Sequence, residues 1–416
     1  MHMDELKEYL LSDIWPLAEK IAEYLRAQKA IDDAAVAGSI RRRSQTVRDI
    51  DIVVAGNDPA AAIQAAAEMP GVDSIIEKSP ARVKARLTTG MPLEILVVPP
   101  ENFIVALLLA TGSKMHCEQL QNHASINNLT FSNFSGSEHD IYRQLKLQYI
   151  EPELREGLGE IEQAVKCKLP DLVAEQDIKG IFHVHTSYSD GGDSLSNMAA
   201  AAYNRGWSYM GIADHSKTAY YARGLKLPAI MAQRREIDSL NAKNSKFVIL
   251  SGIESDILPD GSLDYDDDTL AQFDFVIASV HSAFRQGEAV MTKRIIKAIS
   301  NKYVTMLGHP TGRLLLRRRS YAINLEEIIN AAAVTGTIIE INSSPHRLDL
   351  DWSWCRKAQE QGVLLSVNPD AHSVEEFDYV RYGINTARKG WLSPEDILNT
   401  RPLTEVKKLL NRKRGK

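Results

Sequence analysis

Short apolar runs recur about every thirty residues through the C-terminal half of the chain, and helix-length amphipathic segments lie between them, as at 227–242, 291–301 and 324–334. Runs of this kind with polar ends are typical of buried parallel strands. The alternation predicts seven repeats of strand, loop and helix, which fit an α/β barrel that is closed or nearly closed. The predicted strands span 181–185, 209–215, 247–254, 275–281, 304–309, 337–342 and 363–372.

Histidines and acidic residues stand at or just after the carboxyl ends of these runs. In a β/α barrel such side chains converge on one mouth. Imidazole and carboxylate are ligands of Zn²⁺, Mn²⁺ and Fe²⁺, and the lack of cysteine in the set favours a catalytic metal site over a structural zinc site. Nine candidates exceed the ligand number of one ion, which predicts two or three metals. The candidates are His183, His185, Asp190, His215, Glu254, His281, His309, Asp370 and His372.

The motifs around these candidates are His183-Val-His185-Thr-Ser-Tyr-Ser-Asp190, Ala213-Asp214-His215, Gly252-Ile-Glu254, Ser279-Val-His281, Gly308-His309-Pro310 and Asp370-Ala-His372. In this order they resemble the PHP domain, the polymerase and histidinol phosphatase family, over about residues 177–400. The resemblance implies a distorted seven-stranded β/α barrel that holds three divalent metal ions.

The resemblance also implies which side chains hold each ion. The first set is His183, His185, Glu254 and Asp370, the second is Glu254, His281 and His309, and the third is Asp190, His215 and His372. Metals held in this way supply hydroxide at neutral pH and neutralise phosphate oxygens. The predicted reaction is therefore phosphoester hydrolysis, with these nine residues as its catalytic residues and Glu254 as a bridging carboxylate.

Basic residues beside the predicted mouth are candidates for binding the substrate. Arg313 follows the His309 loop and is expected to clamp phosphate, because its planar guanidinium can bind two phosphate oxygens. Arg223 and Lys226 lie on the loop after His215 and are expected to contribute. The basic run at 317–319 is either a contact for a nucleic-acid backbone or a solvated loop.

Two further expectations concern uncharged and acidic residues near the mouth. Tyr188, Tyr220 and Tyr221 are expected either to stack on a base or simply to cover the site. Asp214 is expected to orient a neighbouring histidine, because histidines that bind a metal usually need an acceptor for their second nitrogen.

The N-terminal part has a different pattern. An amphipathic helix is predicted over about residues 3–29, and the strand-like stretch 47–54 carries Asp49 and Asp51. Two carboxylates at a spacing of two point to one face of a strand, where both can bind Mg²⁺. A strand with solvent-facing acids would give the same pattern.

This stretch, the preceding Gly38-Ser39 turn with Arg42, and Glu94 on a later apolar run resemble the palm of polymerase-β-like nucleotidyltransferases. Residues 111–116 resemble their thumb, and 149–157 resemble the segment that leads into the PHP domain in bacterial family X DNA polymerases. The resemblance implies an α+β palm and thumb whose site residues are Gly38, Ser39, Arg42, Asp49, Asp51 and Glu94.

The palm departs from that family in ways that bear on polymerisation. Glu94 stands where aspartate is expected, and Arg48, Leu96 and Ala110 replace a glycine, a basic residue and an aromatic residue. Phosphoryl transfer by two metals is sensitive to ligand position. Residues 1–150 are therefore expected to form a reduced palm and thumb, a scaffold or a weak nucleotide or DNA platform, without the lyase and fingers regions of the family.

Composition places limits on partners and compartment. The chain has 416 residues, a formal net charge of −5 and three scattered cysteines, and it contains no signal peptide or apolar run of membrane-spanning length. A cytoplasmic enzyme without a membrane partner is expected, and its oligomeric state is left open. The predicted organisation is a palm and thumb at 1–150, a linker at 151–176 and a PHP phosphoesterase domain at 177–416. The basic residues near the C-terminus are expected to be a solvated helix end.

Two substrates fit the predicted chemistry. The first is the 3′ end of DNA. The resemblance to family X polymerases implies a Mn²⁺-dependent 3′–5′ exonuclease acting in DNA repair, with polymerase activity weak or lost. The second is a small phosphomonoester, as in histidinol-phosphate phosphatases, which the acidic net charge favours because a small substrate needs no extended basic surface. An active family X polymerase that also carries the exonuclease is the remaining alternative.

Overall fold

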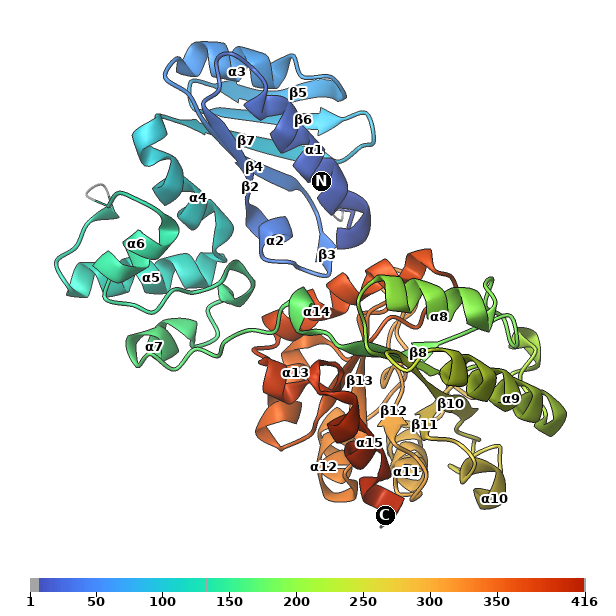
Figure 1. Ribbon diagram of the computed structural model, residues 1–416. Helices are drawn as coiled ribbons and strands as arrows, with labels where there is room; N and C mark the ends of the chain where they lie inside the picture. The colour runs from blue at the N-terminus through green and yellow to red at the C-terminus, as the bar shows by residue number, and fades with distance from the viewer. Residues whose placement is uncertain (1–6, 132–133, 415–416) are drawn as a thin grey trace. The chain divides into compact units, whose positions relative to one another are not determined.

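A computed structural model describes residues 7–131 and 134–414. The chain divides into two compact units, Met1–Pro170 and Asp171–Lys416, which are called here the N-terminal unit and the barrel unit (Figure 1). The division falls within the predicted linker 151–176. No helix in the described ranges is both long and apolar enough to cross a membrane.

The N-terminal unit is built on a five-stranded mixed sheet. Only β4 and β7 are parallel, and Asp51 on β4 pairs in register with Glu94 on β7. The other neighbours are antiparallel. In sheet order the strands are β2 (Asp33–Val36), β4 (Ile50–Ala55), β7 (Pro92–Val98), β6 (Arg82–Leu87) and β5 (Val72–Ser79).

Helices cover both faces of this sheet. The helices α1 (Leu11–Arg26) and α3 (Pro59–Ala67) pack with one apolar core, and α4 (Phe103–Thr111) packs on the opposite face. The predicted opening helix was too long at its start, because residues 9–10 form β1 and pair with β3 (Thr46–Val47); residue 3 lies outside the described residues. The remaining helices are α2 (Gly38–Arg41), α5 (Lys114–Ile126), α6 (Glu138–Gln144) and α7 (Glu160–Val165).

A buried ionic network joins α2 to α6. Arg155 is fully buried and donates to both carboxylate oxygens of Glu138, at 2.8 and 3.2 Å, and Arg41 donates to the same group. Burial raises the pKa of Glu138, but the hydrogen bonds from the two arginines outweigh it and lower the pKa to about 2. The paired charges leave no buried carboxylate uncompensated, so the network has a structural role.

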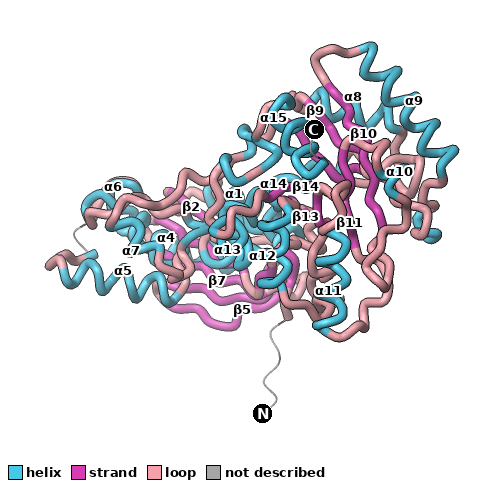
Figure 2. Tube along the Cα trace, turned by 90° about the horizontal axis from the view of Figure 1, so that it is seen from below, coloured by secondary structure: helices cyan, strands magenta, loops and turns pink. Residues whose placement is uncertain are grey.

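The barrel unit contains the seven parallel strands that the apolar runs predict. In one sheet, each strand lies next to the strand that precedes or follows it in the chain, from β8 at one edge to β14 at the other. The helices lie outside the sheet (Figures 1 and 2). The strands are β8 (Gly180–Val184), β9 (Tyr209–Ile212), β10 (Val248–Asp256), β11 (Phe275–Ser279), β12 (Met306–Leu307), β13 (Ile338–Asn342) and β14 (Leu365–Asn368). The helices are α8 (Leu195–Asn204), α9 (Leu227–Lys243), α10 (Asp267–Leu270), α11 (Glu288–Ile299), α12 (Leu325–Thr335), α13 (Trp352–Glu360), α14 (Val380–Lys389) and α15 (Leu403–Asn411).

The barrel is nearly closed between its first and last strands. At the mouth, a parallel bridge joins Val184 at the end of β8 to Ala371 after β14. Below this bridge, the buried side chain of Asn399 takes the place of backbone hydrogen bonds between β8 and β14. Its side-chain NH2 donates to the carbonyl oxygens of Gly180 and Val367, and its side-chain oxygen accepts from the backbone N–H of Val367. One asparagine therefore joins the two edges that backbone pairing leaves open.

Aromatic rings and the C-terminal helix fill the barrel interior. A side chain at Gly211 or Gly252 would meet the ring of Phe275 at 2.7 or 2.3 Å, so only glycine leaves room for it. Helix α15 adds apolar residues to the same interior core. The prediction that the C-terminal basic residues are solvated was wrong for Lys413, which donates to Ile299 and Val304 carbonyls near the base of the barrel.

Candidate metal centre

The nine predicted ligands converge at the carboxyl ends of six strands. Two of them, His183 and Glu254, lie on β8 and β10, and the others stand on the loops that follow β8, β9, β11, β12 and β14. The strands are almost wholly buried, so each strand end fixes the position of its polar side chain. The structure therefore brings together residues that are up to 189 positions apart, since His183 and His372 belong to one cluster.

Glu254 lies at the centre of the cluster. Its Oε1 is 3.2 Å from Nε2 of His183, 3.3 Å from Nε2 of His281 and 3.0 Å from Nε2 of His309. Its Oε2 is 2.9 Å from Nδ1 of His215. One carboxylate that faces four imidazoles with both oxygens has the arrangement of a bridging ligand.

Asp370 forms a second focus beside it. Its Oδ1 lies 3.1 Å from Nε2 of His185 and 3.5 Å from Nε2 of His183. The amide of Asn342 donates to the other oxygen at 2.9 Å. Arg347, which the sequence analysis did not single out, has its Nε 3.6 Å from the same Oδ2.

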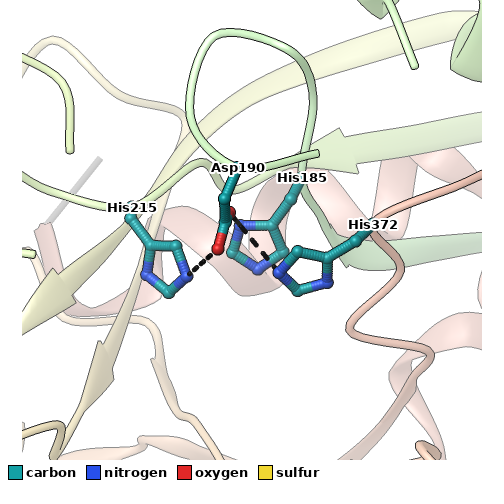
Figure 3. Close-up of side chains that lie close together, drawn as sticks. All are labelled: His185, Asp190, His215 and His372. Carbon is teal, nitrogen blue, oxygen red and sulfur yellow. Dashed lines mark ion pairs between the residues drawn. The ribbon is translucent and has the colours of Figure 1, made fainter. Parts of the chain in front are cut away.

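Asp190 forms a third focus nearer the surface (Figure 3). Its oxygens lie 3.5 Å from Nε2 of His372 and 3.6 Å from Nε2 of His215, and His185 stacks on His372 with ring centroids 4.2 Å apart. Asp190 and His372 are half-buried, whereas the other ligand candidates are buried or nearly so. This edge of the cluster is therefore the part that substrate and solvent reach first.

The donor set fits metal ions. Within the described residues, three groups have ligand atoms that all lie within 4.8 Å of one another: His185, Asp190, His215 and His372; His183, His185 and Glu254; and His215, Glu254 and His281. Five buried ligand atoms make no hydrogen bond, namely His183 Nε2, His185 Nδ1, His215 Nδ1, Glu254 Oε2 and His309 Nδ1. Buried polar atoms without partners are costly, and cations between them would satisfy them.

Three of the predicted ligands have a left-handed backbone conformation. His183, His309 and Asp370 have φ values of 58°, 22° and 53°, in the left-handed region that residues other than glycine avoid. Each such residue costs about 1–3 kcal/mol, and such strain persists where the surrounding structure holds it. At each of the three positions the turned backbone directs a ligand candidate toward the barrel axis.

Buried acids outside the predicted set orient two of the histidines. Glu340 on β13 lies 2.6 Å from Nδ1 of His183 and accepts from the His309 backbone amide at 2.7 Å. Asp256 lies 2.7 Å from Nδ1 of His281. An acceptor at Nδ1 leaves Nε2 free to bind a metal. A signal was present for both: Glu340 is a charge inside an apolar run, and Asp256 lies two positions beyond Glu254 on the same strand face.

The electrostatics of the centre favour positive charge at two of its histidines, His183 and His281. Burial lowers the pKa of His183, but the carboxylates of Glu340, Asp370 and Glu254 outweigh it and raise the pKa well above its usual value. Burial likewise lowers the pKa of His281, yet Glu254 and Asp256 raise it to about 10. The carboxylates therefore stabilise cations within this buried space, which is what a metal centre requires.

Asp214 does not orient a histidine, so that prediction was wrong. Its buried carboxylate accepts from the Thr186 amide and hydroxyl at 2.8 and 2.7 Å, from the Ser189 hydroxyl and from the Gln233 amide. It therefore holds the loop that carries Asp190. The sequence motif places Asp214 beside His215, but successive residues near a strand point to opposite sides.

Arg313 is not placed as the predicted phosphate clamp. Its guanidinium donates to Asp351 at 2.6 Å and to the carbonyl oxygens of Arg347 and Leu348, so it binds loop to loop within the fold. The neighbouring Arg347 takes the position beside Asp370 instead. Sequence proximity to His309 did not indicate that the loop after β13 brings Arg347 to Asp370.

The loop after β9 carries the other predicted substrate-binding residues. Arg223 and Lys226 are both exposed on this loop. Of the three tyrosines, Tyr188 donates to Glu236 at 2.8 Å and packs against the barrel core, which removes it from the mouth. Tyr221 lies beside His215.

The palm carboxylates also lie near one another in the N-terminal unit. Asp51 and Glu94 are cross-strand neighbours, and both line a cavity of about 560 Å³ with Arg82, Asn102 and several apolar side chains. Gly38 has φ 58°, and a Cβ there would lie 1.8 Å from Oδ2 of Asp51, so glycine is required beside this carboxylate. The neighbouring Ser39 is half-buried on the one-turn helix α2.

Ion pairs occupy two of the predicted palm residues. Glu94 lies 3.1 Å from Nε of Arg82 and 3.5 Å from Nζ of Lys84. Arg42 binds Glu156 at 3.0 Å and the carbonyl of Thr111 at 2.9 Å, so its guanidinium joins α2 to the thumb segment. The palm therefore offers two carboxylates, Asp49 and Asp51, whose charges are less compensated.

We expect Asp51→Asn to stabilise the protein above neutral pH in the absence of divalent metal. Burial and then the charges of Asp49 and Glu94 raise the pKa of Asp51 to about 7, so the folded state holds a proton that the unfolded state releases. A raised carboxyl pKa makes stability fall as pH rises from about 4 to 7. At pH 8 the free energy of unfolding of the variant, measured with denaturant, is expected to exceed that of the natural protein by on the order of 2 kcal/mol. This difference should shrink toward pH 4.

Asp73 is exposed, and Asp73→Asn is the matched control. This substitution should change the free energy of unfolding little at pH 8 or at pH 4. An Asp51→Asn variant that is less stable than the natural protein at pH 8 would contradict the burial argument. Added Mg²⁺ should stabilise the natural protein and not the variant if Asp51 is a ligand.

A seven-stranded β/α barrel with imidazoles and carboxylates at its mouth defines the metal-dependent phosphoesterases of the PHP class. The PHP domain family model matches residues 182–344, and the DNA polymerase beta thumb model matches residues 106–156. The DNA polymerase/3′-5′ exonuclease PolX of Bacillus subtilis (strain 168) is 38% identical over 410 residues, which are 95% of this chain and 72% of that protein. The chain therefore belongs to the family X DNA polymerases that carry a PHP domain.

The barrel unit alone has relatives of another kind. A probable phosphatase of Thermoanaerobacter sp. (strain X514) is 30% identical over 249 residues, which are 56% of this chain and 95% of that protein. A probable phosphatase of Caldanaerobacter subterraneus subsp. tengcongensis is 31% identical over 253 residues, or 91% of its length. The match to the first relative continues through the N-terminal unit, whereas these two cover about half of this chain.

Proposed function

We propose that this protein is a metal-dependent 3′–5′ exonuclease that processes DNA 3′ ends, with its chemistry in the barrel unit. The observation that carries the proposal is Glu254, whose two oxygens face the nitrogens of four histidines at 2.9–3.3 Å. Membership of the PolX family supports DNA as the substrate. Metal ions held there would supply an activated water and neutralise the charge of a phosphodiester.

We infer three ions from the donor set. The proposed ligands are His183, His185, Glu254 and Asp370 for the first, Glu254, His281 and His309 for the second, and Asp190, His215 and His372 for the third. Nitrogen and carboxylate ligands without cysteine suit Zn²⁺, Mn²⁺ or Fe²⁺.

The protein's own residues would position the substrate and the ligands. Glu340 and Asp256 fix two imidazoles, and Asp214 holds the loop of Asp190. Arg347, beside Asp370, would neutralise a nonbridging phosphate oxygen of the bound strand. For the palm we propose Mg²⁺ binding at Asp49 and Asp51 with polymerisation weak or lost, because Glu94 is engaged by Arg82 and Lys84.

The test uses a 5′-labelled oligonucleotide with Mn²⁺, the purified full chain, and the variants His183→Ala and Asp51→Ala. Shortening from the 3′ end that is lost in His183→Ala and kept in Asp51→Ala assigns the activity to the barrel. An oligonucleotide whose 3′-terminal linkage is a phosphorothioate serves as the resistant substrate. Cleavage that persists in His183→Ala would overturn the proposal.

A small phosphomonoesterase is the second candidate, because the barrel unit alone matches probable phosphatases over almost their whole length. The same preparations are assayed with histidinol phosphate and 4-nitrophenyl phosphate. Turnover of these esters without shortening of the oligonucleotide would favour this candidate. Incorporation of dNTPs that depends on Asp51 would instead show an active polymerase.

A further inference from the structure

An exposed tyrosine stands directly beside the buried ligand cluster. Tyr221 is 70% exposed, yet its ring centroid lies 5.9 Å from that of His215 and 6.4 Å from that of His281, edge to face in both cases. His215 belongs to the group at the accessible edge of the cluster (Figure 3). A large aromatic ring open to solvent beside metal-ligand candidates is available to contact a bound substrate.

The loop that carries Tyr221 is held firmly. The ring stands on the one-turn helix η5 (Tyr220–Ala222), whose Ala219 and Ala222 flanks are fully buried. Ser216 and Leu225 form a parallel bridge at the base of the loop, and the Leu225 carbonyl also accepts from the Tyr265 hydroxyl. The base of the ring is thus fixed while its face remains open, which is the arrangement of a preorganised binding surface.

A cation also borders the ligand cluster. The guanidinium of Arg347 is close enough to act electrostatically on both the Tyr221 hydroxyl and His309, and it lies 3.6 Å from Asp370. Tyr221 adjoins the cluster at His215 and His281, and Arg347 adjoins it at Asp370. A planar aromatic surface, a phosphate-binding cation and metal ligands together match the parts of a nucleotide: base, phosphate and scissile bond.

We propose that Tyr221 stacks on the terminal base of the strand being cut, and thereby makes the barrel site select a base-bearing phosphodiester. The inference rests on the proposed exonuclease function and adds the residue that determines its specificity. Tyr221 acts by positioning the substrate, since aromatic stacking tolerates any base and fixes the sugar next to the metal centre. A phosphomonoesterase of small, non-aromatic substrates would make no use of such a ring.

The test compares two oligonucleotides that differ only in the last nucleotide, which carries either a base or an abasic tetrahydrofuran. The natural protein is expected to cleave the base-bearing end with a kcat/KM about tenfold or more higher, as base stacking on an aromatic residue provides. Tyr221→Ala should lose this preference by slowing only the base-bearing end, and Tyr221→Phe should keep it. The adjacent Tyr220→Ala is the control, because Tyr220 is 80% exposed and the substitution removes the same group.

Two results would overturn the inference: equal slowing of both substrates by Tyr221→Ala, which would make the ring a shield for His215, or an unchanged preference. Circular dichroism and metal content of each variant exclude a folding defect as the cause. Failure of the proposed function is seen separately, because the natural protein would then cleave neither oligonucleotide, and the inference falls with it.

Discussion

Replacing Glu254 by glutamine is expected to lower phosphodiester hydrolysis by about 10³-fold or more, since a charged group central to the reaction is lost without a change in shape. Both oxygens of Glu254 face imidazole nitrogens, so the substitution removes the one carboxylate shared by His183, His281, His309 and His215. The measurement is kcat/KM on a 5′-labelled oligonucleotide, with metal content determined on the same samples.

The matched control is Glu288→Gln, which makes the same chemical change at an exposed position on α11 and should leave activity within twofold of the natural protein. Activity of Glu254→Gln within tenfold of the natural protein would show that this carboxylate does not bridge the metals. Loss of activity with full metal content would instead indicate a role in the reaction itself.

The bridging position also explains why the centre has so many histidines. Carboxylates in a buried space repel one another, and each needs a compensating charge. Here Glu254 and Asp370 are surrounded by imidazoles, and the pKa of each is held well below its usual value because nearby histidines outweigh the effect of burial. A barrel mouth is suited to this balance, because six strands each contribute one to three side chains from a rigid position.

The sequence predicted the barrel well because its signal is local and repeated. Each apolar run is followed by a polar residue, and neighbouring strands in the sheet are also neighbours in the chain. The convergence of His183, Glu254 and Asp370 could therefore be predicted without knowing the conformation of the long loops. The assignment of Arg313 failed for the opposite reason. Arg313 and Arg347 are 34 positions apart, and both lie on loops near the barrel mouth. Arg313 binds Asp351, whereas Arg347 lies beside Asp370, and only the folded loops show this difference.

The palm shows the same limit. The spacing of Asp49 and Asp51 predicted a shared strand face, but Asp49 lies just before β4 begins at Ile50, in the break between β3 and β4. The register of β4 with β7 brings Glu94 opposite Asp51. Sequence could not show that Arg82, from β6, pairs with Glu94, because that contact depends on a neighbouring strand in the folded sheet. Partners of charged residues are set by tertiary structure, and motif spacing alone does not reveal them.

Glu340 was not among the predicted site residues, although it contacts the predicted ligands His183 and His309. It contacts no substrate-facing surface, and it acts through His183, the His309 backbone amide and the Asn368 side chain, which donates to it at 2.8 Å. It is fully buried on β13. A carboxylate in this position both fixes the imidazole tautomer and makes the ring a stronger ligand.

Glu340→Gln is therefore expected to weaken metal binding by about 10- to 100-fold while the protein stays folded, as is usual when the acceptor behind a metal-bound histidine is changed. The amide keeps the shape and one acceptor oxygen, but it lacks the negative charge that favours a cation at His183. Titration of the metal-free protein with Mn²⁺ or Zn²⁺ measures the change, and the activity of Glu340→Gln should recover as metal concentration rises. Glu254→Gln should not recover in this way, because it loses a ligand. If excess metal fails to restore Glu340→Gln, or if its affinity is unchanged, Glu340 does not position His183 for the metal.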